Sequence, residues 1–320
     1  MIFAHQPTAT MVDVTFAVAS YNSQKYLEVA VRSALKQTSV SVEVIIVDDG
    51  STDKSLALAQ RLAAEDKRVR VLTTPQNGGP SAARNVALEH MLGRWFAVLD
   101  SDDILMPERS RRLIDLAERD GFNIVADNLE VFGDRLDSEL FISGLPEARA
   151  IEVSLDHYFK NSCLFAKTAG YGFLKPIIQR SVIETEALRY DETIRVGEDD
   201  ELMVRLLAKG YRYGLTGYAG YRYRKHDSSI SHRLSSDKAH KMLDIERSLQ
   251  RRIEASTFKG PAYRKRWNSI RNGVVFVDSV EALKSRNFFL AARLLLKRPL
   301  AIGLYRMPLR AALSRLIGKA

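Results

Sequence analysis

Cysteine and long apolar runs are scarce in this chain. A single cysteine, Cys163, excludes an internal disulfide and suits a reducing compartment. No run reaches the roughly 18 apolar residues that a membrane-spanning helix needs, so we expect no such helix. Residues 1–12 lack a basic segment followed by an apolar one, so no secretory signal is expected. These absences predict a protein that is cytoplasmic or lies on the inner face of a membrane.

Acidic residues are scarce in the C-terminal part of the chain. Residues 251–320 contain 16 Lys and Arg against three Asp and Glu, and the whole chain has a net charge of +9. The basic character therefore belongs to the C-terminal region rather than to the body. Hydrophobic residues make up 46% and charged residues 27% of the chain, which is a globular composition and excludes an intrinsically disordered protein.

Apolar strands alternate with amphipathic helices through the first 126 residues. We predict strands over 14–19, 42–47, 69–73, 95–99 and 122–126, with helices over 24–36, 54–64, 81–91 and 108–119. Ser81 is the predicted N-cap of the third helix. This alternation with short connections predicts an α/β fold with a doubly wound, mostly parallel sheet.

The alternation weakens after residue 128. Residues 129–175 show no clear pattern, and residues 177–182 form a strand that could return to the sheet. A helix over 201–209 and strands within 211–223 follow. From about residue 235 the pattern is helical to the end, which predicts a domain boundary there.

Carboxylates follow two of the predicted strands directly. Asp48 and Asp49 end the second strand, and Asp100, Asp102 and Asp103 lie just after the fourth. In open α/β sheets, ligands bind beyond the carboxyl ends of the strands. Closely spaced carboxylates suit Mg²⁺ or Mn²⁺, which usually keeps free coordination positions for a substrate phosphate. The alternative is an acidic turn that caps the next helix.

Five motifs together identify a family. They are Ala19-Ser20-Tyr21-Asn22, Val47-Asp48-Asp49-Gly50-Ser51-Thr52-Asp53, Asn77-Gly78-Gly79-Pro80-Ser81-Ala82-Ala83-Arg84-Asn85, Asp100-Ser101-Asp102-Asp103 and Gly197-Glu198-Asp199-Asp200. In this order they resemble the successive motifs of the family 2 inverting glycosyltransferases, which have the GT-A fold. The resemblance covers residues 12–232. It implies a GT-A fold with a Rossmann-like nucleotide-binding half, which we assign to a domain over residues 1–235. The helical pattern and the charge count predict a separate basic helical region over 236–320, outside the resemblance.

The resemblance implies a sugar nucleotide donor, most often a UDP-sugar. Its base would lie at the ends of the first two strands, near Ala19, with Tyr21 stacked on the ring. Asp49, with Asp48 beside it, would accept a hydrogen bond from the ring N–H. Arg84 would neutralise the donor phosphates. The alternatives are a half-buried tyrosine, an Asx turn or helix cap, and an exposed helix arginine.

The resemblance also implies a metal site. Asp100 and Asp102 form the DxD pair for Mn²⁺ or Mg²⁺, with Ser101 between them in the donor site and Asp103 as a further ligand candidate. The ion would stabilise the leaving diphosphate. His226 lies where many members have a histidine near the diphosphate or the metal; its alternative is a structural histidine, and His232 has a weaker claim.

Asp199 is the predicted general base, because the family places there the carboxylate that takes the proton of the acceptor hydroxyl. Glu198, predicted to contribute to the donor site, and Asp200 compete for the role. The alternative is that these acids only stabilise a helix N-terminus. A base opposite the leaving group implies a single-step inversion at the anomeric carbon.

The basic C-terminal region has apolar residues at helical spacing. Ile302, Tyr305, Leu309, Leu313 and Leu316 recur with Arg306, Arg310, Arg315 and Lys319 near the edges, although Pro299 and Pro308 interrupt any single helix. Such a segment suits the inner membrane surface, where a lipid-linked saccharide acceptor would be found. The alternative is a helical cap with a solvated basic face. Nucleic-acid binding is not expected, because no reader motif occurs.

The chain looks most like the glucosyltransferases of succinoglycan-type exopolysaccharide synthesis, which predicts glucose as the transferred sugar. Two other functions compete. A Mg²⁺-dependent phosphohydrolase of haloacid-dehalogenase type also has a strand that ends in Asp-x-Asp, but its strand usually lies near the N-terminus. A non-catalytic membrane-associated scaffold would not need Asp49, Asp100, Asp102 and Asp199 together.

Overall fold

A computed structural model describes residues 12–133, 136–166, 170–226 and 234–306, which separate into two compact units. Among these residues, the α/β unit comprises 12–153, 174–195 and 211–226. The helical unit comprises 154–166, 170–173, 196–210 and 234–306. The helical unit thus takes up two segments from within the predicted domain 1–235, and the division at residue 235 stays a prediction.

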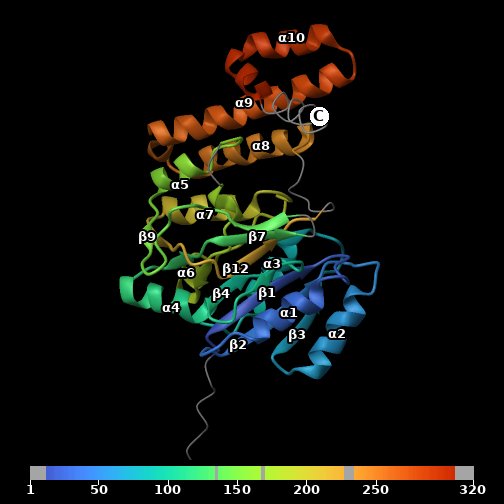
Figure 1. Cartoon of the computed structure of the whole chain (residues 1–320), viewed down its shortest axis with the longest axis vertical. Coiled ribbons are helices and arrows are strands. Elements are labelled where there is room, and N and C mark those ends of the chain that lie inside the picture. The colour runs from blue at the N-terminus through green and yellow to red at the C-terminus, as the bar shows by residue number, and fades with distance from the viewer. Residues whose placement is uncertain (1–11, 134–135, 167–169, 227–233, 307–320) are drawn as a thin grey trace, which may run out of the picture. The chain divides into compact units, whose positions relative to one another are not determined.

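Four parallel strands form the centre of the α/β unit, in the order β3-β2-β1-β4 (Figure 1). They are β1 (Val14–Ser20), β2 (Val42–Asp48), β3 (Val69–Thr73) and β4 (Trp95–Val98). Strands β2 and β4 are buried throughout, as continuous apolar runs covered on both faces must be. Helices α1 (Leu27–Leu35), α2 (Ser55–Glu65), α3 (Pro80–His90) and α4 (Arg109–Asp120) alternate with the strands as predicted.

The sheet continues beyond β4 in mixed directions. Strand β10 (Ile177–Gln179) lies antiparallel between β4 and β6 (Ile124–Ala126), and β11 (Tyr213–Leu215) and β9 (Ile151–Glu152) complete the order. The predicted strand 177–182 does return to the sheet, but it ends at Gln179 because helix α6 (Arg180–Thr185) follows at once. The α/β class is confirmed, with a sheet whose first half is parallel.

A second, smaller sheet takes two of its strands from the segment in which the sequence showed no pattern. Its order is β5 (Ile104–Leu105), β12 (Tyr221–Arg224), β7 (Leu129–Gly133) and β8 (Leu136–Leu140). Tyr221 of β12 pairs with Leu105 of β5. This pairing brings the residues after β12 close to the carboxylates that precede β5.

The start of α3 differs from the prediction. Gly79 is the N-cap, with a φ of 82° that favours glycine, and Pro80 is the first helical residue. The Ser81 hydroxyl does not cap the helix, because it donates to the carbonyl oxygen of Ile194 at 2.8 Å. The predicted N-cap was therefore wrong by two residues.

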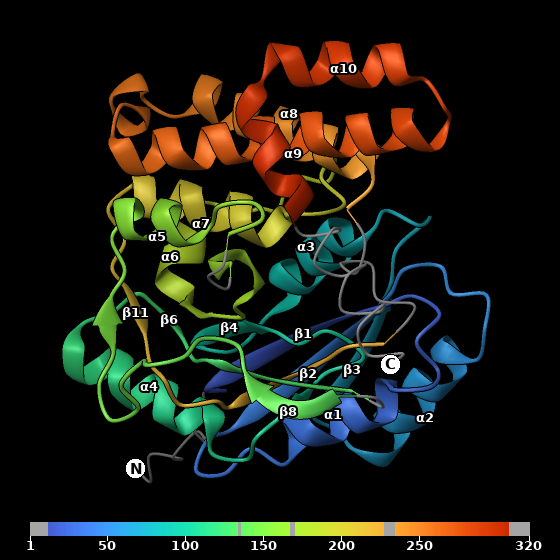
Figure 2. The same cartoon turned by 45° about the horizontal axis from the view of Figure 1, so that its top comes forward.

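Three helices from the C-terminal part of the chain pack together in the helical unit. In Figures 1 and 2, α10 (Phe288–Lys297) runs beside α9 (Pro261–Lys284), and α8 (Ser236–Arg252) packs on α9 as well. The unit also contains α5 (Leu155–Asn161), η1 (Tyr171–Phe173), α7 (Glu198–Ala208), η3 (Ala255–Phe258) and η4 (Pro299–Tyr305). Over the described residues, no helix combines the length and the apolar character needed to cross a bilayer.

Candidate functional site

The ends of β1 and β2 bring two of the predicted site segments together. Ser20 pairs in register with Asp48, and the backbone N–H of Asp49 donates to the Ser20 carbonyl oxygen at 2.8 Å. Ala19 is half-buried opposite Val47, and the next residue but one, Tyr21, is 52% exposed. A tyrosine ring with half its surface open at the end of a parallel strand is free to stack on a planar ligand.

Asp49 and Asp48 are both buried but are used differently. The Asp49 carboxylate accepts hydrogen bonds from the Thr74 hydroxyl at 2.7 Å and from the backbone N–H groups of Gly78 and Gly79 at 2.9 and 2.7 Å. It therefore fixes the glycine-rich loop. Asp48 accepts from the Ser51 N–H at 3.0 Å through Oδ2, while its buried Oδ1 has no partner among the described residues. An unpaired buried acceptor is costly, so Asp48 Oδ1 marks a place for a ligand donor.

Asp100 lies between two buried cations. Its Oδ1 accepts from Arg84 of α3 at 3.0 Å, and its Oδ2 lies 2.9 Å from the Lys175 ammonium. Burial raises the pKa of Asp100, but the charges of Lys175 and Arg84 outweigh it and hold the pKa at about 2. Both oxygens of the Asp100 carboxylate are therefore already paired with protein cations.

Asp102 and His226 form a second polar contact in the cluster. The imidazole Nε2 of His226 lies 2.8 Å from Asp102 Oδ2, and the Asp102 side chain is 31% exposed. Ser101 is half-buried in the turn between the two aspartates of the DxD pair. The structure therefore brings together two residues that are 124 positions apart in the sequence.

Asp103 lies beneath this pair as a buried carboxylate. It accepts from the Tyr221 hydroxyl at 2.8 Å and from the Arg224 backbone N–H at 2.7 Å. Burial, with the charges of Asp100 and Asp102 added, raises the pKa of Asp103 well above its usual range. Both of its oxygens are engaged by the strand β12, so the geometry favours Asp102 over Asp103 as a ligand.

A divalent cation fits the Asp102–His226 pair. No group of three or more His, Cys, Asp or Glu side chains gathers as a metal site in the part of the chain that the structure describes. One carboxylate and one imidazole suit an ion that takes its other ligands from water and substrate phosphates, as Mg²⁺ and Mn²⁺ usually do. A cation beside Asp102 would also offset the negative charge that raises the pKa of Asp103.

The predicted base lies on α7, in the helical unit. This helix begins at Glu198, three residues earlier than predicted, after Gly197 with a φ of 88°. Glu198 and Asp199 therefore lie in its first turn, where the helix dipole stabilises negative charge. Glu198 is buried and Asp199 is half-buried.

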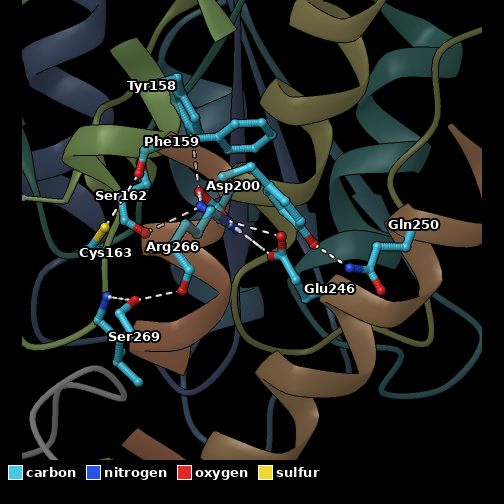
Figure 3. A network of polar contacts seen from close by, with 11 residues as sticks. Tyr158, Phe159, Ser162, Cys163, Asp200, Glu246, Gln250, Arg266 and Ser269 are labelled. Atoms are coloured by element: carbon cyan, nitrogen blue, oxygen red, sulfur yellow. Dashed lines mark hydrogen bonds and ion pairs between the residues drawn. The ribbon is translucent and has the colours of Figure 1, made fainter. Parts of the chain in front are cut away.

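Asp200, the third candidate base, belongs to a buried polar network (Figure 3). Its carboxylate accepts two hydrogen bonds from Arg266 of α9, at 2.5 and 3.2 Å, and one from the Tyr158 hydroxyl of α5 at 3.0 Å. Arg266 also donates to Glu246 of α8 at 2.8 Å. The Arg266 guanidinium thus links α7, α8 and α9, Tyr158 joins α5 to them through Asp200, and the Asp200 carboxylate is engaged in this structural network.

Comparison with known proteins identifies the family of this chain. The family model described as Glycosyl transferase family 2 matches residues 15–171. The chain is 37% identical over 307 residues to the succinoglycan biosynthesis protein ExoO of Rhizobium meliloti, which covers 96% of this chain and 88% of ExoO. The chain belongs to glycosyl transferase family 2. Family membership confirms the glycosyltransferase prediction and sets aside both the phosphohydrolase and the scaffold alternatives.

Solved structures confirm the GT-A fold. Residues 1–349 of Staphylococcus aureus TarS in complex with UDP-GlcNAc superpose with a TM-score of 0.61 at 17% identity, over 88% of this chain and 90% of that one. The mannosyltransferase PcManGT from Pyrobaculum calidifontis, in complex with GDP-Man and Mn²⁺, gives 0.60 at 17% identity, over 94% and 80%. At this identity the likeness concerns the fold alone.

Lys175 is the site residue that the sequence did not reveal. It lies in the segment without a clear pattern, yet its ammonium contacts Asp100 directly. One signal was available: Lys175 comes just before the returning strand, and an antiparallel neighbour of β4 must begin beside the carboxyl end of β4. The sequence pattern did not show the direction of that strand, and the contact between Lys175 and Asp100 depends on that direction.

Proposed function

We propose that this family 2 glycosyltransferase moves a sugar, with inversion, from a UDP-sugar to a hydroxyl of a lipid-linked saccharide during surface polysaccharide synthesis. The observation that carries the proposal is the 37% identity to ExoO over nearly the whole chain, because ExoO is a succinoglycan biosynthesis protein. The UDP-GlcNAc bound by TarS supports a UDP-sugar as donor. Glucose is the sugar that the succinoglycan relationship favours.

The nucleoside would bind at the ends of β1 and β2. Tyr21 is exposed enough to stack on uracil, near the half-buried Ala19. The ring N–H would donate to Asp48 Oδ1, the acceptor without a protein partner, while Asp49 keeps the glycine-rich loop in place. This modifies the family-based assignment, in which Asp49 receives the ring N–H and Asp48 only assists.

The diphosphate would lie beside the Asp100 cluster. Arg84 and Lys175 supply positive charge there, each already oriented by Asp100. Asp102 and His226 would hold Mg²⁺ or Mn²⁺, and the ion would stabilise the charge that develops on the leaving diphosphate. Ser101 and the buried Glu198 remain proposed contributors to the donor site.

Asp199 would act as the general base. The assignment rests on the Gly197-Glu198-Asp199-Asp200 motif and on the engagement of Asp200 by Arg266. The Asp199 carboxylate would take the proton of the acceptor hydroxyl as its oxygen attacks the anomeric carbon, and the donor diphosphate would leave from the opposite face. One displacement at that carbon inverts it, so an α-linked donor would give a β-linked product.

The enzyme would act on the inner face of the cytoplasmic membrane. The basic region after residue 250 supports this location, because anionic lipid attracts Lys and Arg. The predicted amphipathic segment continues through Leu309, Leu313 and Leu316, which lie outside the described residues together with Pro308, Arg310, Arg315, Lys319 and His232.

Titration of UDP with and without Mn²⁺ tests the metal part of the proposal. We expect Mn²⁺ to raise the affinity for UDP by about tenfold or more, because the ion would bridge the protein and the phosphates. Asp102→Asn should remove most of this gain. Asp115→Asn, a substitution at a carboxylate 61% exposed on α4, serves as the matched control and should change nothing. Equal UDP affinity in Mn²⁺ and in a chelator would contradict the assignment of Asp102 and His226.

A further inference from the structure

The last described elements expose a group of large apolar side chains. Phe288, Phe289, Leu296, Leu300 and Ile302, here called the apolar patch, are 54–80% exposed. The opposite side of the same segment is well packed, since Ala301 and Leu295 join a cluster with Phe276 and Val277 of α9. The segment is therefore anchored in the helical unit, and the patch is its outward side. Such a concentration of exposed aromatic and aliphatic side chains marks an interaction surface.

Cationic residues are interleaved with the apolar patch. Phe289, Arg293 and Leu296 recur at spacings of four and three, which places them on one side of α10. Lys284, Arg286 and Lys297 are exposed close by in the sequence. No acidic residue follows Glu281. The surface is thus amphipathic and of a single charge sign.

The positive charge around the apolar patch indicates which kind of partner would bind there. A second copy of the chain would bring the same cations to the interface, and residues 307–320 contain Arg310, Arg315 and Lys319 with no acid. Both would repel the patch. An anionic lipid surface complements it, since Lys and Arg are attracted to the headgroups while Phe and Leu enter the boundary with the acyl chains. A helix with this composition lies in the interface and does not cross it.

We propose that α10 and η4 dock the enzyme on an anionic lipid surface through the apolar patch. The inference rests on the proposed function for its purpose, because docking brings the enzyme to a lipid-linked acceptor. It names the docking element as residues 288–302, which lie upstream of most of the segment that the sequence pattern singled out.

Sedimentation with vesicles tests the docking of the full chain. We expect binding to phosphatidylcholine vesicles that contain about 30% phosphatidylglycerol to exceed binding to pure phosphatidylcholine by about tenfold or more, and to weaken as salt rises. Phe289→Ser with Leu296→Ser should lower binding by about tenfold. Arg293→Glu with Lys297→Glu should abolish the preference for anionic vesicles.

Matched controls come from the α/β unit and from a second readout. Leu92→Ser with Leu140→Ser removes two side chains that are 57% and 52% exposed, and it should leave vesicle binding unchanged. A Phe289→Trp variant should be quenched by brominated lipid, which reports insertion directly. Titration of UDP on the same samples should give the wild-type affinity, so loss of docking is distinguished from loss of the donor site.

Three results would overturn the proposal. They are equal binding to neutral and anionic vesicles, unchanged binding after Phe289→Ser with Leu296→Ser in a protein that melts like the wild type, and self-association of the wild type through the patch without vesicle binding. The last result would assign the patch to a second copy of the chain.

Discussion

Asp199→Asn should lower the kcat of sugar transfer by about a hundred- to ten-thousand-fold, because a general base contributes that much to a proton transfer. Asparagine has nearly the same shape as aspartate but does not accept the proton of the acceptor hydroxyl at neutral pH. The affinity for UDP should stay near the wild-type value, since Asp199 is not assigned to the nucleotide. Steady-state rates with a UDP-sugar and the lipid acceptor measure the first quantity, and UDP titration measures the second.

A matched substitution in the same unit provides the control. Asp237→Asn changes an exposed acid in the first turn of α8 and should leave the rate of sugar transfer unchanged. A wild-type rate in Asp199→Asn, with a loss in Glu198→Gln instead, would transfer the role to Glu198.

Arg266→Met should lower the free energy of unfolding of the helical unit by about 3–5 kcal/mol, the usual effect of breaking a buried ion pair from one side. The substitution leaves the carboxylates of Asp200 and Glu246 without their shared cation. The attraction of those carboxylates outweighs burial and raises the pKa of Arg266 well above its usual value, which shows how strongly the network favours the charged guanidinium.

Unfolding followed by Trp267 fluorescence measures this effect locally. Trp267 neighbours Arg266 in α9, and Trp95→Phe removes the other tryptophan of the chain, which lies in β4. Arg264→Met changes an exposed arginine of the same helix and should alter stability by about 0.5 kcal/mol or less. If Arg266→Met lowers the free energy of unfolding no more than Arg264→Met does, the network contributes little to stability.

Sequence order was enough to predict the parallel strands of the fold and the gathering of several candidate site residues at one edge of the sheet. Continuous apolar strands and short connections require a parallel arrangement, so Tyr21, Asp49 and Asp100 had to follow strands that end at one edge. The structure then joined Asp102 to His226, a contact that the family resemblance anticipated. The roles of these residues in binding remain predictions.

Other features depend on contacts that no local pattern encodes. Lys175 reaches Asp100 only because β10 runs antiparallel to β4, and the three-residue strand gave no sign of its direction. Arg266 is one of the 16 Lys and Arg counted over residues 251–320, yet it is 3% exposed and contacts three helices through two carboxylates and a carbonyl. Charge counting along the chain does not separate a buried cation from an exposed one.

Incubating the enzyme with a panel of radiolabelled UDP-sugars, membrane lipid extract and Mn²⁺ tests the central claim most directly. The account predicts that one UDP-sugar, UDP-glucose in the first instance, labels the lipid fraction and releases UDP in equal amount, and that a chelator and Asp199→Asn each suppress the labelling. Absence of lipid labelling from every UDP-sugar would contradict it.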